Sequence, residues 1–581
     1  MTVAIGIDFG TESGRAVMVD VATGAELATA VHAYANGVID RRLPAPDDDV
    51  VLEADWALQD PADYVATVGA TVRELLATTG IDPADVIGIG IDFTSCTMLP
   101  TTADGTPLCQ VPELRREPHA WVKLWKHHAA QPEADRINAL AASRGEAWLP
   151  RYGGRISSEW FYAKSLQILD EAPRVYQAAD RLIEAADWIV WQLTGSETRN
   201  ACTAGYKAQW SKRDGFPGAA FFAGLAPGLA SIVDDKMSRD IDRLGAMAGG
   251  LSAAAAGWTG LRAGTPVAVA NVDAHVSVPA VGVTAPGTMV AVMGTSTCHL
   301  VLGDRLALAE GMCGVVEDGI VPGFFGYEAG QSAVGDIFGW FIRTGVPPEV
   351  HEQARRDGTD VHHVLERDAA ARRPGETGLV ALDWWNGNRS ILVDVDLSGL
   401  LLGATLATGP ADIYRALLES TAFGTRRIIE SLDAAGVAVD RIVACGGLPE
   451  RNALLMQLTA DITGREVDVA ASTQAPAVGS AMYGAVAAGA GRGGYASIEA
   501  AASAMARPHA RTFRPEGGTA GTYDRLYREY VGLHDYFGRG GNDVMKRLRA
   551  IRDEASASGD RAAEPISEPA VPSTGGRSAT P

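Results

Sequence analysis

The stretch DFGTESGR, residues 8–15, joins two apolar segments that read as the strands of a hairpin, residues 3–7 and 16–20. Its glycines permit positive φ and let backbone N–H groups approach an anion closely, while its threonine and serine add hydroxyl donors. Asp8 cannot bind phosphate directly, but carboxylate, water and phosphate oxygens are the ligands that Mg²⁺ prefers. The turn therefore predicts one side of a polyphosphate site, with Asp8 as the candidate metal ligand.

A related turn, Gly294-Thr295-Ser296-Thr297, stands inside a second apolar hairpin at residues 288–302. A third junction follows a short strand at residues 441–445, where Gly446-Gly447 precedes a helical segment with free N–H groups at its start. The chain has no G-x-x-x-x-G-K-[ST] loop, which excludes a P-loop protein. The repeated hairpin indicates an internal duplication, with two α/β domains that close on a polyphosphate from opposite sides.

Composition narrows the function classes. A chain of 581 residues is too long for one core, and its formal charge of −21 has the wrong sign for binding nucleic acid or a basic membrane-surface role. The six cysteines are scattered without a C-x-x-C pair, which favours a reducing compartment over disulfides or zinc. We expect neither a signal peptide nor a membrane span, because the first residues show no basic and apolar leader pattern and no uninterrupted run of about 20 apolar residues occurs. We expect a cytoplasmic protein with small-molecule partners.

The pattern along the chain suggests where the domains divide. An apolar run begins at Pro266 after a glycine-rich stretch, so we expect an N-terminal domain at residues 1–265 and a C-terminal domain at residues 266–540. Residues 541–581 become rich in Ala, Ser, Gly, Pro and charge, which predicts a disordered tail. Nothing in the sequence sets the number of subunits, and a homodimer stays open.

The three glycine junctions resemble the two phosphate loops and the adenosine loop of the actin/hexokinase/Hsp70 ATPase fold. More narrowly, residues 398–426 (SGLLLGATLATGPADIYRALLESTAFGTR) resemble the second signature of the FGGY carbohydrate kinases. Further stretches resemble the branch of that family that acts on ribulose; they are GIDFTSCTMLP (90–100), KLWKHHAA (123–130), ISSEW (156–160), CTAGYKAQW (202–210), VDAH (272–275), GYEAGQSAVGDIFGWF (326–341), LDWWNGNR (382–389) and ACGGLPERN (444–452). The similarity runs from about residue 3 to residue 540.

This resemblance implies an α/β fold with two duplicated ribonuclease-H-like domains around a central cleft. It also implies MgATP-dependent phosphorylation of L-ribulose at O5, with D-ribulose as a further substrate, in L-arabinose breakdown. Many sugar kinases of the family carry W-x-D-x-R where this chain has Trp125-Lys126-His127-His128. That departure disfavours a xylulose or glycerol kinase.

The resemblance also assigns site residues. Asp273 is the expected catalytic base, since a sugar hydroxyl needs an acceptor for its proton during attack on phosphorus. The expected sugar contacts are Ser95 (through its backbone), Lys207, Asp273 and Glu328. The expected nucleotide contacts are Thr11, Ser13, Arg15, Gly294, Thr295, Gly335, Gly446, Gly447 and Asn452. Gln331 and Asp336 are further expected to line the cleft, and four tryptophans fit either the sugar or the core: Trp125, Trp160, Trp384 and Trp385.

Three alternatives remain. The chain fits another sugar or polyol kinase of the family, an ATP-binding chaperone or cytoskeletal protein of the same fold, or a catalytically silent regulator. The chaperone or cytoskeletal protein needs neither an acid above a sugar nor the Lys207 and Glu328 pair. A silent, sugar-responsive regulator is disfavoured because Asp8, Thr11 and Asp273 are all present. Kinetics on a panel of ketoses and polyols separates the first from our preferred assignment.

Overall fold

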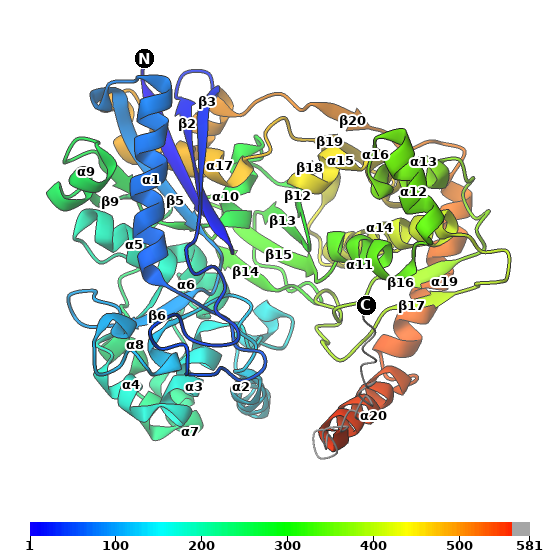
Figure 1. Ribbon diagram of the computed structural model, residues 1–581, viewed down its shortest axis with the longest axis horizontal. Coiled ribbons are helices and arrows are strands. Elements are labelled where there is room, and N and C mark those ends of the chain that lie inside the picture. The colour runs from blue at the N-terminus through cyan, green and yellow to red at the C-terminus, as the bar shows by residue number, and fades with distance from the viewer. Residues whose placement is uncertain (560–581) are drawn as a thin grey trace, which may run out of the picture.

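The computed structural model describes residues 1–559 and places two sheets in the centres of the two halves of the chain (Figure 1). The first sheet has the strand order β3-β2-β1-β5-β10-β9, with β11 also paired to β5. Its strands are β1 (Val3–Phe9), β2 (Ser13–Asp20), β3 (Glu26–Ala33), β5 (Val86–Phe93), β9 (Met247–Gly250), β10 (Pro266–Ala268) and β11 (Asn271–Val272).

The second sheet repeats this plan in the order β14-β15-β13-β12-β18-β19-β20. Its strands are β12 (Gly287–Met293), β13 (Thr297–Gly303), β14 (Gly314–Glu317), β15 (Phe325–Gln331), β18 (Val439–Cys445), β19 (Glu466–Val469) and β20 (Arg511–Phe513). In each sheet a run of antiparallel strands is followed by two parallel ones and a final antiparallel strand. The duplication predicted from the two hairpins is therefore confirmed.

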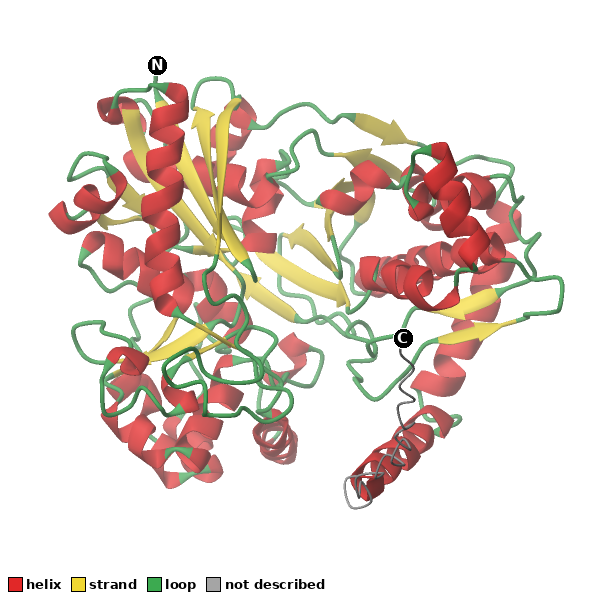
Figure 2. Cartoon of the chain, in the orientation of Figure 1, coloured by secondary structure: helices red, strands yellow, loops and turns green. Residues whose placement is uncertain are grey.

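Helices cover the faces of both sheets (Figure 2). Those of the first half are α1 (Pro61–Thr79), α2 (Gln131–Arg144), α3 (Phe161–Glu171), α4 (Pro173–Ala178), α5 (Ala185–Thr194), α6 (Ala201–Lys207), α7 (Ala219–Leu225), α8 (Ile232–Lys236), α9 (Ala253–Thr259) and α10 (Asp273–Ala280). Local signals account for α1: the Asp60 side chain accepts from the Ala62 N–H at its start, and Gly80 ends it with φ 66°.

The lower part of the first half contains a second, smaller sheet, which lies below the main sheet in Figure 1. Its order is β4-β7-β6-β8, with the bounds β4 (Leu58–Gln59), β6 (Met98–Thr101), β7 (Val122–Lys123) and β8 (Arg181–Glu184). It packs with α2, α3 and α7 around a separate apolar cluster that includes Trp148, Phe161 and Phe221.

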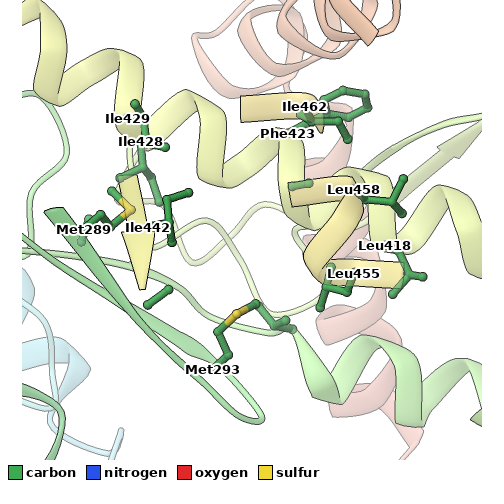
Figure 3. Packing of buried hydrophobic residues seen from close by; sticks show 14 of the residues in the cluster. Met289, Met293, Leu418, Phe423, Ile428, Ile429, Ile442, Leu455, Leu458 and Ile462 are labelled. Carbon is green, nitrogen blue, oxygen red and sulfur yellow. The ribbon is translucent and has the colours of Figure 1, made fainter. Parts of the chain in front are cut away.

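The second half packs its helices around the core of the second sheet, where Met289 and Ile442 from the strands lie beside Ile428 and Ile429 from a helix (Figure 3). These helices are α11 (Gly335–Gly345), α12 (Pro348–Asp357), α13 (Val361–Ala370), α14 (Pro410–Ala434), α15 (Gly447–Arg451), α16 (Ala453–Thr463), α19 (Ala520–Gly538) and α20 (Val544–Gly559). The helix α18 (Ile498–Met505) packs instead on α10 of the first half. A two-stranded ribbon, β16 (Val380–Leu382) and β17 (Leu400–Leu402), completes this half.

The helix α17 (Ala475–Ala488) comes late in the chain yet packs on the first sheet, against β1 and β5. Glycines make this close approach possible. A Cβ at Gly6 would lie 1.7 Å from the Ala477 carbonyl oxygen, and one at Gly90 would lie 1.7 Å from the Ser480 carbonyl oxygen. The two halves are thus joined by a shared helix–sheet layer rather than by a simple linker.

We expect Gly90→Ala to lower the free energy of unfolding by about 3 kcal/mol or more, because the added methyl overpacks a backbone-to-backbone contact. Thermal denaturation followed by circular dichroism measures the effect. Gly257→Ala is the matched control: this glycine lies inside α9 with open space where a Cβ would stand, so alanine should stabilise slightly through helix propensity. Equal melting temperatures for the Gly90→Ala variant and the wild type would contradict the packing.

Two expectations about domain limits differ from the structure. The boundary placed between residues 265 and 266 falls within the first sheet, because β10 and β11 pair with β5. The tail predicted to be disordered from residue 541 instead begins with α20. Met545 of that helix is buried, and Lys546 and Arg549 pair with Asp394 and Asp396. Residues 560–581, the rest of the predicted tail, lie outside the described residues.

Within residues 1–559, no helix is long and apolar enough to span a bilayer.

Candidate active site

Three carboxylates gather where parallel strands of the first sheet end. Asp8 of β1 is in register with Asp92 of β5. Asp273 begins α10 directly after β11, which also pairs with β5. The carboxyl ends of parallel strands are where α/β proteins commonly bind ligands. Asp8 and Asp273 were expected here from the sequence, whereas Asp92 was not, although its strand ends in the same Asp-Phe pair as β1.

Burial and mutual repulsion shift the pKa values of these acids. Burial raises the pKa of Asp92 well above its usual range, and the neighbouring Asp8 charge adds to the shift. The pKa of Asp8 is also raised by burial, against the attraction of Arg15, whose Nε lies 3.3 Å from Asp8 Oδ2. Burial and the charge of Asp8 raise the pKa of Asp273 to about 7. Asp273 is thus poised to exchange a proton near neutral pH, as a general base requires.

We expect kcat/KM for the sugar to fall roughly tenfold per pH unit below pH 7, because a base acts only when deprotonated and this carboxyl takes up its proton through that range. Asp8, Asp92 and Glu328 face Asp273 from three strands, and Lys207 opposes them from α6. Steady-state rates between pH 5.5 and 8.5 provide the measurement. The residual activity of an Asp273→Asn variant should lose this dependence, and a flat wild-type profile would contradict the assignment.

The first glycine turn is closed by a backbone hydrogen bond from Gly10 N to the Ser13 carbonyl oxygen, 3.0 Å long. Thr11 Oγ1 accepts a hydrogen bond from Trp125 Nε1 at 3.1 Å. Arg15 reaches both Asp8 and, at 3.4 Å, the side chain of Gln474 next to α17. The three residues expected to hold phosphate on this side therefore lie around one turn beside Asp8, and their contact with phosphate stays a prediction.

The second turn has the same construction, with Gly294 N donating to the Ser296 carbonyl oxygen at 2.8 Å. Gly335 packs on it: its N–H donates to the Gly294 carbonyl oxygen at 3.1 Å, and a Cβ at Gly335 would lie 2.6 Å from that oxygen. The Thr295 carbonyl oxygen accepts from the Val334 N–H at 2.7 Å. The structure thus brings Gly335 together with Gly294 and Thr295, although it lies far along the sequence from them.

The third junction lies against the same turn. Gly446 has φ 96°, and a Cβ there would lie 2.5 Å from the Met293 carbonyl oxygen, while Gly447 is open. Asn452 has a buried side chain that accepts from the Leu455 N–H to cap α16 and donates to the Tyr414 hydroxyl. These contacts hold Asn452 at this junction, and its contact with the nucleotide stays a prediction.

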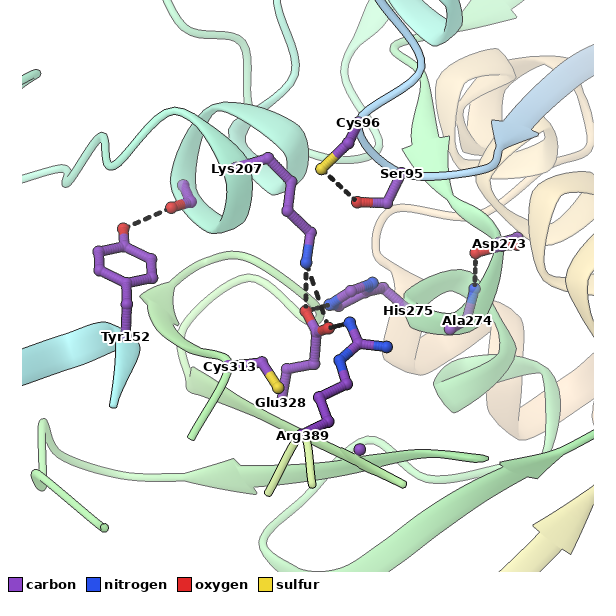
Figure 4. A network of polar contacts seen from close by, with 12 residues as sticks. Ser95, Cys96, Tyr152, Lys207, Asp273, Ala274, His275, Cys313, Glu328 and Arg389 are labelled. Atoms are coloured by element: carbon purple, nitrogen blue, oxygen red, sulfur yellow. Dashed lines mark hydrogen bonds and ion pairs between the residues drawn. The ribbon is translucent and has the colours of Figure 1, made fainter. Parts of the chain in front are cut away.

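The expected sugar contacts Lys207 and Glu328 form a buried ion pair between the two halves (Figure 4). Lys207 Nζ lies 3.2 Å and 3.1 Å from the two Glu328 carboxylate oxygens. His275 Nε2 lies 3.3 Å from Oε2, and Arg389 Nη2 lies 3.0 Å from Oε1. Sequence reasoning missed His275 and Arg389, although both stand in stretches that carry the family resemblance, VDAH and LDWWNGNR.

Electrostatics keep both partners of this pair charged. Burial opposes the charge on Glu328, but Lys207, His275 and Arg389 together hold its pKa well below the usual range. Burial likewise opposes the charge on Lys207, and the attraction of Glu328 holds its pKa above the ordinary value. The cluster therefore presents ionic hydrogen-bonding groups, which suits recognition of a polyhydroxylated ligand.

Ser95 lies in the turn that follows β5, where Cys96 takes φ 64°. A buried lysine, Lys164, fixes this turn: its Nζ donates to the Cys96 carbonyl oxygen at 2.6 Å and to the Leu124 carbonyl oxygen at 2.7 Å. The backbone at Ser95, the expected sugar contact, is thus held beside the segment that carries Trp125. Lys164 was not identified from the sequence, because nothing local marks a lysine as buried.

The remaining candidates divide between site and core. Trp160 lies beside the cluster, with Lys207 Nζ 5.4 Å from its ring centroid. Trp384 is buried against His534, and Trp385 packs on Trp340.

Gln331 was expected to line the cleft, but it is buried. Its side chain is hydrogen-bonded to His299, Asp383, Thr421 and Thr425. Asp336 is exposed at the start of α11.

The residues around Asp8 fit a magnesium ion. Mg²⁺ in phosphate-transfer sites takes one or two carboxylates and completes its shell with water and phosphate oxygens. Asp8 and Asp92 offer such a pair, and Asp92 Oδ1 is buried without a hydrogen-bond partner. Among residues 1–559 no cluster of three or more His, Cys, Asp or Glu side chains forms a protein-only metal site. The donor set therefore suits a metal that arrives with its nucleotide.

The duplicated sheets, their two similarly built glycine turns and the acids at the strand ends of the first sheet fit a two-domain phosphotransferase of the actin-like ATPase fold. Solved structures agree on the fold. A xylulose kinase from Lactobacillus acidophilus superimposes with a TM-score of 0.75 at 16% identity, over 93% of this chain and 99% of that one. A xylulose kinase from Rhodospirillum rubrum gives 0.72 at 24% identity, over 92% and 98%.

The family is defined by sequence. Residues 3–279 match the N-terminal domain of the FGGY family of carbohydrate kinases, and residues 289–488 match its C-terminal domain. A protein from Geobacillus thermodenitrificans named ribulokinase is 58% identical over 95% of this chain and 98% of its own length. One of the same name from Mycolicibacterium smegmatis is 54% identical over 95% and 96%. The chain belongs to the FGGY family and is an ATP-dependent sugar kinase.

Proposed function

We propose that this kinase transfers the γ-phosphoryl group of ATP to O5 of L-ribulose, giving L-ribulose 5-phosphate and ADP in L-arabinose catabolism. The observation that carries the proposal is the identity of 54–58% with several proteins named ribulokinase, over 94–95% of the chain. The buried Lys207–Glu328 pair beside Asp273 supports it, since these groups suit a ligand rich in hydroxyls. D-Ribulose is the second substrate we expect.

In the proposed reaction the O5 hydroxyl attacks the γ-phosphorus of ATP. A new O5–P bond forms, the bond from that phosphorus to the β–γ bridging oxygen breaks, and the O5 proton passes to Asp273. The half-buried Asp273 carboxylate receives the Ala274 N–H at 2.6 Å, which leaves its second oxygen for the substrate. Phosphoryl transfer depends mainly on such positioning and on charge stabilisation.

The glycine turns are proposed to hold the nucleotide. Thr11, Ser13 and Arg15 would face the phosphates from one side, and Gly294, Thr295 and Gly335 from the other. Gly446, Gly447 and Asn452 would bracket the adenosine. Mg²⁺ supplies charge neutralisation of the phosphates when it is bound, and Asp8 would hold it with Asp92 beside it. Domain closure over both substrates would exclude water, which otherwise competes with O5 for the phosphoryl group.

A coupled assay of ADP release tests the substrate. L-Ribulose, D-ribulose, L-xylulose, D-xylulose and glycerol are compared at saturating MgATP. We expect the highest kcat/KM for L-ribulose. A preference for xylulose or glycerol would overturn the substrate assignment while leaving the sugar kinase class intact, and ADP release unaffected by any sugar would contradict the transfer reaction itself.

A further inference from the structure

The Glu328 oxygen Oε1 has no free acceptor position in this structure. Each oxygen of an ionised carboxylate offers about two lone-pair sites. Lys207 donates to both oxygens and Arg389 also donates to Oε1, whereas His275 Nε2 lies 3.3 Å from Oε2 without a hydrogen bond. For Oε1 to accept a hydrogen bond from a sugar hydroxyl, Lys207 or Arg389 must withdraw from it.

Arg389 is the partner placed to withdraw. The side chains of Lys207 and Glu328 are each 3% exposed and that of His275 is 2% exposed, whereas that of Arg389 is 29% exposed. Arg389 stands in the long connection between β16 and β17, and its contact with Glu328 is a single hydrogen bond. Figure 4 shows one guanidinium nitrogen directed at Glu328 and another turned away from the carboxylate.

The rest of the guanidinium is available to a ligand. A guanidinium carries five N–H donors, and among residues 1–559 the Arg389 side chain makes no hydrogen bond other than that to Glu328. The aliphatic stem of Arg389 packs directly on Gly330, which leaves room for it because glycine has no side chain. A Cβ at Gly330 would lie 2.9 Å from Arg389 Cδ. A ketose presents only oxygen atoms, each of which can accept from these donors.

We propose that Arg389 is a sugar-contacting, specificity-determining residue that turns from Glu328 to an oxygen of the ketose as Glu328 accepts a sugar hydroxyl. The inference rests on the proposed function and names a further residue of the same site. It predicts that the guanidinium contributes to binding of the sugar and not of ATP, and that it discriminates among ketoses that differ in one hydroxyl.

The test compares Arg389→Gln and Arg389→Lys with the wild type, in calorimetric binding of L-ribulose without nucleotide and in kcat/KM for the ketose panel. We expect sugar affinity to fall at least tenfold in Arg389→Gln and less in Arg389→Lys, with KM for ATP unchanged within twofold. The ratio of kcat/KM between L-ribulose and L-xylulose should shrink several-fold in Arg389→Gln. Arg372→Gln is the matched control, because Arg372 also lies in the second half, is partly exposed and has one carboxylate partner, Asp412.

The proposal would be overturned if both Arg389 variants kept the sugar affinity and the ratio of kcat/KM between ketoses within twofold of the wild type. It would also be overturned if KM for ATP rose as much as the sugar affinity fell. Arg389→Lys retains the charge and keeps the test valid if Arg389→Gln fails to fold. If the wild type prefers another sugar of the panel, the proposed substrate is wrong. The Arg389 variants are then measured with the preferred sugar, so that the two ideas are judged separately.

Discussion

Replacing Asp273 by Asn is expected to lower kcat by about 10²–10⁴-fold, the usual contribution of a general base, while the sugar dissociation constant changes by no more than several-fold. Asparagine keeps the size and hydrogen-bonding shape of the side chain but cannot accept the O5 proton. The loss should therefore appear in turnover rather than in binding. ADP release under saturating substrates and calorimetric titration with L-ribulose give the two quantities.

Asp524→Asn provides the control for this experiment, since Asp524 is an exposed acid on α19 paired with Arg426. It should leave both quantities unchanged. A near-normal kcat in the Asp273→Asn variant would eliminate Asp273 as the base. A loss confined to sugar affinity would instead give Asp273 a purely binding role.

Removing the Glu328 charge is expected to lower both the free energy of unfolding and the sugar affinity more than removing the Lys207 charge does. Glu328→Gln leaves Lys207 and Arg389 as neighbouring cations with no carboxylate between them, whereas Lys207→Met leaves Glu328 with Arg389 and His275. Stranding buried charges typically costs about 3–5 kcal/mol. We therefore expect the larger loss of unfolding free energy, and a loss of sugar affinity of at least 100-fold, for Glu328→Gln.

Urea denaturation of the two single variants and of the Lys207→Met/Glu328→Gln double variant measures this difference. The double variant should recover part of the stability but none of the sugar binding. Glu466→Gln is the control, since its partner Arg514 is mostly exposed and such surface pairs contribute less than about 1 kcal/mol. Stability losses in the reverse order would show that Arg389 and His275 do not hold the carboxylate.

Features with local causes could be predicted from the sequence. The bounds of α1 follow from Asp60, Pro61 and Gly80, and those of β5 from an uninterrupted apolar run. The two hairpins indicated the duplication because each carries its own turn. In the site, the first turn indicated Asp8, and the family resemblance implied Lys207, Asp273 and Glu328; the structure brings these residues into two adjoining clusters.

Features that depend on contacts between distant segments could not be predicted. His275 and Arg389 join the site only because β15 brings Glu328 to them from elsewhere in the chain. Lys164 and Gln331 are buried by tertiary packing, against the polar character of their side chains. The glycine-rich stretch before Pro266 suggested a linker, but the strands after it still belong to the first sheet. The helix α20 is anchored by ion pairs with a loop that is remote in the sequence, and no local sequence pattern predicts these pairs.

The placement of α17 has a consequence for how the protein is made. During synthesis β1 and β5, which end at Phe9 and Phe93, leave the ribosome long before the helix that covers them, which starts at Ala475. One apolar face of the first sheet therefore stays open while the second half is translated. Contacts of such long sequence separation also slow folding. We expect the nascent first half to depend on chaperones, and a fragment ending before residue 475 to aggregate rather than fold as an independent unit.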